Sequence, residues 1–550
     1  FDVFDTSLTR LTGSPASLFT LLGRRLRNAS LLDCSPEAFA RARIRAEGRA
    51  KSNQAGREIN LHEIYRELGA TYGWAESERS RVAEWECALE RDLIRAIPAV
   101  IERAERARAR GDHVAFLSDM YLPVDFIKGE LARHGLWKEG DSCLVSSESG
   151  KCKKDGGLFQ CLMKTLGLGA GAITHLGDNH LADVETPRRL GIQAAEFSDA
   201  ALNRFERILE AYTWDTEGLS SLLAGASRMA RLTVPTHSAQ EAALREVTAG
   251  VMAPTLTGYV LWILRRAQES GVKRIYFVSR DGQILKQIAG SLATKLRLDF
   301  ELRYIYGSRQ AWHLAAVESI GENELSWILE DSDGSTVRRV LSRVGLVPED
   351  EQPALASVGL GRADWDRRLS DNDRVLLRRF LEGHGVQTSI VKQAHSRRRQ
   401  LVQYLLQEGL FAQTPSALVE IGWRGRMQRS LTTVVTAQGG VPPRFFYFGL
   451  ASNPTGSTEG LRETYFFDAG QKTGYLGAVP GVYTIIETFC AAEHGITLGY
   501  EARGKETIPV LRGEANDKVM QWGLPLVRRT AEAFLDNFIC DPELVNWRGD

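Results

Sequence analysis

Four short stretches near the start of the chain carry the residue types that phosphoryl transfer needs. Asp2 follows an apolar residue and precedes Thr6 by four positions, a pattern that presents a nucleophilic carboxylate at the end of a strand. The later stretches supply a hydroxyl, a lysine and a pair of acids: Ser118, Lys153 with Lys154 as the alternative, and Asp178 with Asp183. A carboxylate attacks phosphorus only where the negative charge of both partners is offset, and this set combines a cation with carboxylates that suit Mg²⁺. These stretches predict a phosphate site.

The elements that must position these residues alternate between strands and helices after residue 112. Short apolar runs end just before each polar stretch, at 114–117, 143–145 and 173–176, with a last strand near 193–195. This repeated order predicts a doubly wound parallel sheet with ligands at the carboxyl ends of its strands. Residues 14–110 have helical patterns instead, opened by Ser14-Pro15 and Ser35-Pro36 as N-cap signals. A helical block inserted after the first motif predicts a lid.

The four motifs, in this order, resemble the haloacid dehalogenase superfamily over about residues 1–200. The resemblance implies an α/β domain with a helical cap at about residues 14–105, and a magnesium-dependent phosphatase. It implies the following roles: Asp2 as nucleophile, Thr6 closing the first motif, Ser118 binding phosphate, Lys153 as the third-motif lysine, and Asp178 and Asp183 as the acidic motif. Mg²⁺ is then expected on Asp2, Phe4 and Asp178, and the neighbouring Asp119 and Asn179 are expected to contact substrate.

One position departs from the family pattern. Phosphatases of this family carry a second aspartate two residues after the nucleophile, as general acid and base, and this chain has Phe4 there. Asp5 could act from the next position, or an acid from the cap could serve. Dehalogenase-type members also lack this acid, but the acids at 178 and 183 and the paired lysines favour a phosphate over a haloacid. A scaffold that has lost catalysis remains an alternative.

A second α/β unit is predicted from residue 241, after a helical linker at 201–240. Strand patterns at 274–278, 304–306, 417–419 and 445–448 surround a helical insertion at about 320–410. Glycine-bearing, arginine-rich loops follow these strands, as Ser279-Arg280-Asp281-Gly282 and as Glu420 to Gln428. Such loops bind anions at helix N-termini. Two of them on neighbouring strands suggest a ligand with phosphate groups at both ends.

This second unit resembles a type I phosphoribosyltransferase. The resemblance implies that Ser279, Arg280, Asp281 and Gly282 hold the pyrophosphate of phosphoribosyl pyrophosphate. The loop from Glu420 would hold the ribose and its 5-phosphate, through Glu420, Gly422, Arg424, Gly425, Arg426 and Gln428, and Arg309 would add a phosphate contact. Two departures stand out, because Glu420 is a single acid where a pair is usual and Gly425-Arg426 replaces a small residue and threonine. Glu487 and His494 are candidate bases on the acceptor side.

The two domains together resemble bacterial proteins of surface polysaccharide assembly, such as that of O-antigen. The resemblance implies a bifunctional enzyme that transfers 5-phosphoribosyl to a glycan acceptor, expected to be lipid-linked, and then hydrolyses the 5-phosphate to leave ribofuranose. Association with other glycan assembly enzymes would follow. Two alternatives stay open: a stand-alone Mg²⁺-dependent phosphatase whose C-terminal domain only recognises substrate, and a non-catalytic scaffold of a glycan assembly complex.

Composition sets the outer limits. A chain of 550 residues is expected to hold two or three domains. Lys plus Arg equals Asp plus Glu at 69 each, and no nucleic-acid partner is predicted. No apolar run approaches the roughly 20 residues of a membrane span, and the seven cysteines show neither metal nor disulfide spacing. A cytoplasmic location is expected, with the inner face of the membrane as the alternative. A strand leading into Asp2 needs about four more residues, so we expect the native chain to extend upstream.

Overall fold

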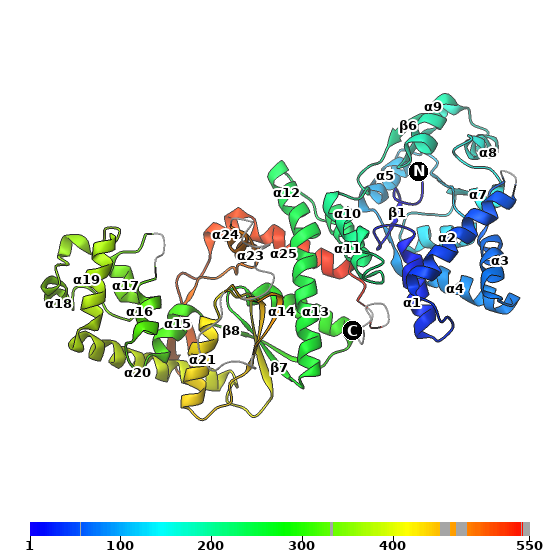
Figure 1. The fold of residues 1–550 in the computed structure, drawn as a ribbon. Coiled ribbons are helices and arrows are strands. Elements are labelled where there is room, and N and C mark those ends of the chain that lie inside the picture. The colour runs from blue at the N-terminus through cyan, green and yellow to red at the C-terminus, as the bar shows by residue number, and fades with distance from the viewer. Residues whose placement is uncertain (55–56, 331–333, 452–461, 469–480, 541, 543–550) are drawn as a thin grey trace. The chain divides into compact units, whose positions relative to one another are not determined.

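The computed structural model describes residues 1–54, 57–330, 334–451, 462–468, 481–540 and 542 (Figure 1). Its internal contacts divide the chain into two compact units. Unit 1 is Phe1–Thr255 with the stretch that begins at Pro525, and unit 2 is Leu256–Leu524. The sequence places this division earlier, near residue 240. The division falls later because a continuous run of helix, Ala239–Glu269, crosses it.

The parallel strands predicted for unit 1 are present, and they flank the first residues of the chain. Asp2 forms a parallel bridge with Leu117 of β3 (Ala115–Ser118), and its N–H donates to the carbonyl of Leu176 in β5 (Thr174–Gly177) over 2.8 Å. On the outer sides, β3 pairs in parallel with β4 (Ser142–Val145), and β5 pairs in parallel with β6 (Gln193–Glu196). The order is therefore β4, β3, residues 1–2, β5, β6. This order brings the polar ends of β3 and β5 to either side of Asp2.

Helices cover these strands, as a doubly wound sheet requires. Apolar residues of β3 and α8 form one core cluster, in which Leu117, Leu158, Phe159 and Leu162 are buried. The helices of this part of unit 1 are α5 (Pro98–Ala109), α6 (Val124–Arg133), α7 (Ser146–Ser149), α8 (Gly157–Leu166) and α9 (Thr186–Arg189). A π-helical turn, His180–Glu185, follows β5.

The helical block after the first motif is present and has a defined base. Its helices are α1 (Ser17–Asn28), α2 (Pro36–Asn53), α3 (Leu61–Tyr72) and α4 (Glu76–Leu93). Ser35 caps α2 as predicted, whereas α1 begins at Ser17 rather than at Pro15. A short antiparallel ribbon closes the block, β1 (Leu8–Arg10) with β2 (Ile94–Ala96). Since α5 follows the ribbon and leads back to β3, the cap ends near residue 93 and not near residue 105. The ribbon could not be predicted, because strands of three residues are too short for a periodic signal.

The segment predicted as a linker, 201–240, packs firmly into unit 1. It forms α10 (Arg204–Ala211), α11 (Leu219–Thr233) and the start of α12 (Ala239–Val247). A Cβ added at Gly225 would lie 2.1 Å from the backbone carbonyl carbon of Leu11, so only glycine permits this approach of α11. Arg228 of α11 donates to the carbonyls of Arg10 and Thr12, each over 2.8 Å. These helices therefore support the base of the cap.

Unit 2 is built on a five-stranded parallel sheet. Its order is β11-β10-β9-β7-β8, and every neighbouring pair runs parallel. The strands are β7 (Arg274–Val278), β8 (Glu301–Ile305), β9 (Ser416–Glu420), β10 (Arg444–Gly449) and β11 (Arg462–Phe467). The first two strands thus lie to one side and the later ones to the other, so the winding reverses between β7 and β9. Ligands of doubly wound sheets bind outside such a switch point.

Both faces of this sheet are covered. On one face, Tyr276 and Leu418 pack with α20 (His384–Gln407), α21 (Arg426–Ala437) and α15 (Arg309–His313). The hairpin β12 (Thr497–Arg503) with β13 (Glu506–Leu511) joins this face through Tyr500. On the other face lies α13 (Ala253–Glu269), whose Tyr259 donates to the carbonyl of Phe446 over 2.9 Å. α14 (Gly282–Leu296) follows β7.

The helical insertion predicted at about 320–410 is present with a core of its own. Residues between Leu314 and Ala394 form a separate buried cluster around Trp365 and Phe380. The helices before α20 are α16 (Glu322–Ile328), α17 (Val337–Arg343), α18 (Gln352–Ser357) and α19 (Asp371–Glu382), and they group at one end of unit 2 (Figure 1). Further along the chain, α23 (Val482–Phe489) and α24 (Asp517–Trp522) belong to unit 2, whereas α25 (Leu524–Asn537) belongs to unit 1 from Pro525 onward.

One helix passes a length-and-composition test for a membrane span. It is Ala239–Glu269, and 72% of its most apolar window is buried inside the protein, as in the core helix of a soluble protein. All seven cysteines are free thiols.

Candidate active site

A buried lysine joins two carboxylates at the centre of unit 1. Lys153 donates from Nζ to Asp2 and to Asp183, the latter over 2.7 Å. All three side chains are at most 7% exposed. Burial alone lowers the pKa of Lys153, but the two carboxylates outweigh burial and raise it, so the lysine stays charged. The structure thereby decides between the two candidate lysines, since Lys154 is exposed.

Both carboxylate oxygens of Asp183 are engaged in hydrogen bonds. Its Oδ1 lies 2.9 Å from Nε2 of His175 and also receives Lys153, while its Oδ2 accepts the N–H of Asn179 over 3.1 Å. Burial raises the pKa of Asp183, but His175 and Lys153 outweigh it and bring the pKa to about 2. Burial also lowers the pKa of His175 to about 4, which leaves it neutral. Asp183 is therefore suited to orient Lys153.

The carboxylates around Lys153 are also suited to bind a divalent cation. Oxygens of Asp2, Asp178 and Asp183 lie within 4.8 Å of one another, the one such group of three or more ligand residues in the described part of the chain. Oδ2 of Asp2 is buried without a hydrogen-bond partner among the described residues. Asp178 is open to the cavity, yet partial desolvation and the nearby carboxylates of Asp2 and Asp5 raise its pKa to about 7. With Asp183 engaged elsewhere, Asp2 and Asp178 are the carboxylates best placed to hold Mg²⁺.

A cavity of about 660 Å³ opens above this cluster, between the strand ends and the cap. Most of the residues predicted for this site line it: Asp2, Phe4, Asp5, Ser118, Asp119, Lys153, Asp178, Asn179 and Asp183. Thr6 is fully buried and does not line it. Asp119 accepts the backbone N–H of Lys153 on both oxygens, at 2.8 and 3.0 Å, and Asn179 caps the turn after β5. These two side chains therefore also hold the loops in place.

Phe4, which stands where a second acid was expected, stacks against Arg10. The Arg10 guanidinium lies 4.0 Å from the ring centroid of Phe4 and is held by two 2.8 Å hydrogen bonds to the buried Glu90. Asp5, in the left-handed conformation at φ 54°, accepts from Thr9 over 2.6 Å and lies 3.4 Å from Arg228. The cap contributes two further acids to the cavity wall, Glu47 and Glu58. Asp5 and Glu58 are thus placed to protonate a leaving group, whereas Lys51 and Arg43 outweigh burial and lower the pKa of Glu47, which suits it less to that role.

Sequence reasoning missed the residues that orient this site from behind. His175 is a buried histidine inside an apolar strand, a signal that pattern reading treats as ordinary core. Arg228 is separated from Asp5 by more than two hundred residues, and nothing in its local sequence marks it. Glu58 accepts from Ser146 over 3.2 Å, and Ser146 in turn accepts the N–H of Met120.

A second cavity, of about 320 Å³, lies at the switch point of the unit 2 sheet. It is lined by predicted residues from three strand ends: Ser279, Arg280, Asp281, Arg309, Glu420, Gly422, Arg424, Gly425 and Arg426. Pairing of β7 with β9 brings Asp281 and Glu420 to the same edge, as predicted. The peptide bonds Ser279–Arg280 and Gly422–Trp423 are cis. We call this space the switch-point cavity.

Two helices begin at the switch-point cavity without a side-chain cap. The N-cap residues are Asp281 for α14, whose side chain makes no bond to the first turn, and Gly425 for α21, which has no side chain. The N–H groups of a helix start favour an anion. A Cβ at Gly282 would lie 2.5 Å from the backbone of Phe277, and one at Gly422 would lie 2.1 Å from the carbonyl oxygen of Gly449. Both glycines are therefore required by close approach.

Three arginines of the switch-point cavity converge on one acid. Glu330 lies 2.6 Å from Arg424, 3.1 Å from Arg426 and 3.6 Å from Arg309. A single carboxylate cannot neutralise three guanidinium groups, so this side of the cavity has an excess of positive charge among the described residues. Guanidinium groups bind phosphate in a bidentate manner. The arginines therefore suit a ligand with several negative charges.

Three acids gather on the other side of the switch-point cavity. Burial raises the pKa of Glu420 to about 8 and the pKa of Asp281 to about 7, and each acid is further raised by a neighbouring carboxylate. Glu487 accepts from Nε1 of Trp423 over 2.9 Å. Protonated carboxyls can donate to ligand oxygens as well as accept from ligand hydroxyls. This side therefore suits a hydroxyl-bearing ligand.

Three residues of the second predicted site have other surroundings. Gly282 lies in the first turn of α14, outside the lining. Gln428 is buried and accepts from the Tyr447 hydroxyl over 3.3 Å. Both ring nitrogens of His494 are engaged, with Tyr304 at 2.7 Å and the carbonyl of Gly495 at 2.8 Å. A histidine held in this way has a structural role, whereas Glu487 does line the cavity.

Because two carboxyls of the switch-point cavity have raised pKa values, the stability of unit 2 should fall as pH rises. The folded state keeps both protons up to about pH 7 to 8, whereas the unfolded chain releases them near pH 4. Because the folded state binds more protons than the unfolded chain in this pH range, the free energy of unfolding decreases as pH rises. Glu420→Gln is expected to flatten the slope and to stabilise unit 2 by about 2 kcal/mol at pH 8.5.

The measurement is urea unfolding at pH 5.5, 7 and 8.5, followed by hydrogen exchange of peptides from β7 and β9, which reports on unit 2 alone. The matched control is Glu382→Gln, which removes an exposed carboxylate of α19 and should run parallel to the wild type. Parallel curves for Glu420→Gln as well would contradict the prediction.

Comparison with known proteins gives structural matches only. No protein-family model matches the chain, and no curated protein matches it. A 2-haloacid dehalogenase from Pseudomonas syringae pv. Tomato DC3000 is 16% identical, with a TM-score of 0.29, over 36% of this chain and 85% of its own. A dehalogenase with an intermediate complex is 19% identical with a TM-score of 0.25, over 37% and 84%, and a further dehalogenase structure gives 19% and 0.25, over 35% and 80%.

These structural neighbours are dehalogenases, and each matches about a third of this chain. At these TM-scores and identities, statements about chemistry rest on the residues of this chain alone. Unit 1 is an α/β domain with a carboxylate-lysine site at its parallel strand ends. Unit 2 is a doubly wound α/β domain with an arginine-rich cavity at its switch point.

Proposed function

We propose that unit 1 is a magnesium-dependent phosphatase. The observation that carries the proposal is the buried Asp2–Lys153–Asp183 cluster beside Asp178, at strand ends beneath a cavity of about 660 Å³. Mg²⁺ held by Asp2 and Asp178, with the Phe4 backbone as a further ligand, would offset the charge of the substrate phosphate. Haloacid hydrolysis would not need the cation-binding acid at 178.

The residues around Asp2 support a two-step reaction. A carboxylate oxygen of Asp2 attacks phosphorus, the bond to the sugar oxygen breaks, and an aspartyl-phosphate forms. Lys153 and the Ser118 hydroxyl hold the transferring oxygens, and Asp183 with His175 keeps Lys153 aimed at them. Asp5 or an acid of the cap gives the leaving oxygen its proton. Water then attacks phosphorus, which releases phosphate and restores the carboxylate.

For unit 2 we propose a transferase that uses phosphoribosyl pyrophosphate. The supporting observation is the switch-point cavity, in which three arginines and two open helix N-termini face three acids. The arginines and N–H groups would bind the phosphate groups, and Glu420 with Asp281 would bind the ribose hydroxyls. Transfer to a glycan hydroxyl would give a phosphoribosylated product, from which unit 1 would remove the 5-phosphate. This order would account for both chemistries in one chain of a surface polysaccharide pathway.

Two other functions remain in competition. A stand-alone phosphatase would use the switch-point cavity only to recognise substrate, and a non-catalytic scaffold would have neither activity. Titration of phosphoribosyl pyrophosphate with Mg²⁺ into the protein by calorimetry separates them from the two-step enzyme. We expect binding that survives in Asp2→Asn and weakens at least tenfold in Glu420→Gln, because the donor lies in unit 2. No binding by the wild type would refute the transferase, and a screen of sugar phosphates for phosphate release would then separate a phosphatase from a scaffold.

A further inference from the structure

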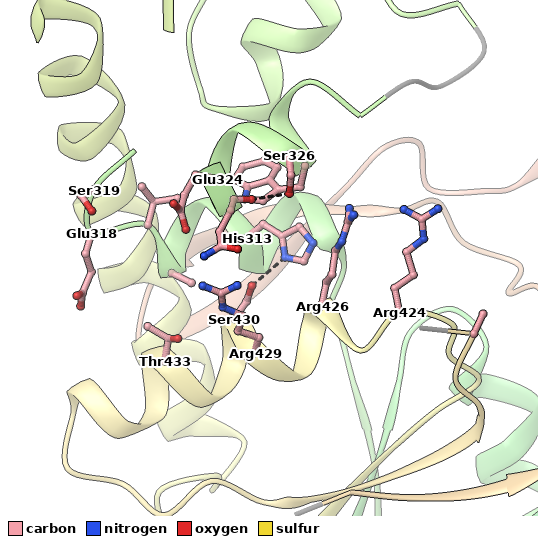
Figure 2. A pocket seen from close by; sticks show the side chains of 15 residues that line it. His313, Glu318, Ser319, Glu324, Ser326, Arg424, Arg426, Arg429, Ser430 and Thr433 are labelled. Carbon is pink, nitrogen blue, oxygen red and sulfur yellow. Dashed lines mark hydrogen bonds between the residues drawn. The ribbon is translucent and has the colours of Figure 1, made fainter. Parts of the chain in front are cut away.

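A larger cavity, of about 630 Å³, adjoins the switch-point cavity and shares Arg424 and Arg426 with it. We call it the helix-side cavity, because one wall is the start of α21. Figure 2 shows polar side chains along this wall, and Arg426, Arg429, Ser430 and Thr433 recur at the spacing of one helix face. The opposite wall is the start of the helical insertion, with Ser319, Asn323, Ser326 and Trp327.

The charges of the helix-side cavity favour an anion. Arg424, Arg426 and Arg429 face two acids, Glu318 and Glu324. Both acids have partners: Glu318 lies 3.7 Å from Arg398, and Glu324 accepts the N–H of Gly321 over 3.0 Å. Arg429 is exposed and makes no ion pair within the part of the chain that the structure describes, and Arg424 and Arg426 share the one carboxylate of Glu330. Positive charge is thus left over for a ligand.

A buried ring nitrogen at this cavity also lacks a partner. His313 is 4% exposed, and its Nδ1 lies 2.9 Å from Oγ of Ser430, the contact drawn in Figure 2. Its Nε2 is buried without a hydrogen-bond partner among the described residues. An unpaired polar atom is costly to bury, and a ligand atom would remove that cost. The ring centroid of Trp327 lies 5.3 Å from that of His313, so an aromatic face adjoins this nitrogen.

We propose that the helix-side cavity binds the acceptor through a carbohydrate that carries a carboxylate or a phosphate. The serine, threonine and asparagine side chains match sugar hydroxyls, and the Trp327 ring offers a flat apolar surface to a sugar. Arg429 binds the anionic group, with Arg424 and Arg426 between this group and the donor. The role of this ligand as an acceptor rests on the proposed transferase. The binding of an anionic carbohydrate rests on the cavity alone.

The test uses three probes of one size on the whole protein: methyl β-glucuronide, glucose 6-phosphate and neutral methyl β-glucoside. Ligand-observed NMR titration gives their dissociation constants for the wild type and for Arg429→Gln. The control is Arg399→Gln, which removes an exposed arginine of α20 that lines none of these cavities. We expect the charged probes to bind at least tenfold more tightly than the glucoside. Arg429→Gln should remove about tenfold of that affinity and Arg399→Gln none.

The two charged probes distinguish a carboxylate ligand from a phosphate ligand. Binding of either that falls in Arg429→Gln supports the proposal, because glucose 6-phosphate bound by unit 1 would not depend on Arg429. Equal binding of all three probes, no binding by any, or a loss of the same size in both variants overturns it. Calorimetry with phosphoribosyl pyrophosphate on the same proteins separates this site from the proposed function. Donor binding that persists in Arg429→Gln while charged-sugar binding falls supports both. Charged-sugar binding that depends on Arg429 without any donor binding leaves this site standing and refutes the transferase.

Discussion

Asp2→Asn is expected to lower phosphate release from ribose 5-phosphate by about 10⁴-fold or more, with the fold intact. The amide has nearly the same shape as the carboxylate but cannot attack phosphorus. Asp2 lies at a strand end with one oxygen bonded to Lys153 and the other buried without a hydrogen-bond partner among the described residues. Its replacement removes the nucleophile and one cation ligand at once. The loss should therefore appear in kcat rather than in KM alone.

The assay measures inorganic phosphate released in the presence of Mg²⁺, with circular dichroism to confirm folding. Asp112→Asn is the matched control, since Asp112 is exposed and, among the described residues, forms an ion pair with Arg110 alone. A variant that keeps a tenth or more of wild-type turnover would exclude Asp2 as the nucleophile. If the wild type itself releases no phosphate from any sugar phosphate, the scaffold alternative gains support.

Lys153→Met should destabilise unit 1 by about 3 to 5 kcal/mol, the usual cost of removing one partner from a buried ion pair. Methionine keeps the length of the side chain but leaves the carboxylates of Asp2 and Asp183 without their shared cation. Two buried negative charges close together then repel each other. His175 cannot compensate readily, because burial holds its pKa at about 4.

Urea unfolding monitored by hydrogen exchange of β3 and β5 peptides gives the stability of unit 1. Lys154→Met provides a close control, because this neighbouring lysine is exposed. The double variant Asp2→Asn/Lys153→Met should recover part of the loss, since it removes one of the unpaired charges. Equal stability of Lys153→Met and Lys154→Met would show that the buried cluster adds nothing to folding.

Much of unit 1 could be predicted because its chemistry sits at strand ends. The short apolar runs before Ser118 and Asp178 are local signals, and parallel strands gather their carboxyl ends at one edge. Strand order could not be predicted, because backbone pairing of Asp2 with Leu117 and Leu176 carries no signature in the side chains. The choice of Lys153 over Lys154 also depended on burial, which two adjacent lysines do not reveal.

Unit 2 shows the same limit more strongly. The glycine and arginine loops were visible, and so was the helical insertion. The structure alone brought Glu330 of that insertion against three arginines, and it placed Gln428 and His494 in structural contacts. Glu330 lies 94 positions from Arg424 in sequence and His494 lies 190 from Tyr304, and contacts over such separations are set by packing, not by local pattern.

By itself the sequence determined the kinds of chemistry in this protein: a carboxylate, a hydroxyl, a lysine and paired acids at successive strand ends, and two anion loops farther on. These are local, because a strand, its polar end and the following helix are neighbours in sequence. Only the tertiary structure decided which charged and polar side chains come together. Asp2 meets Lys153 and Asp183, Arg228 meets Asp5, and His313 faces the helix-side cavity. Burial and proximity set hydrogen-bond partners and pKa values, and both arise from the folded chain as a whole.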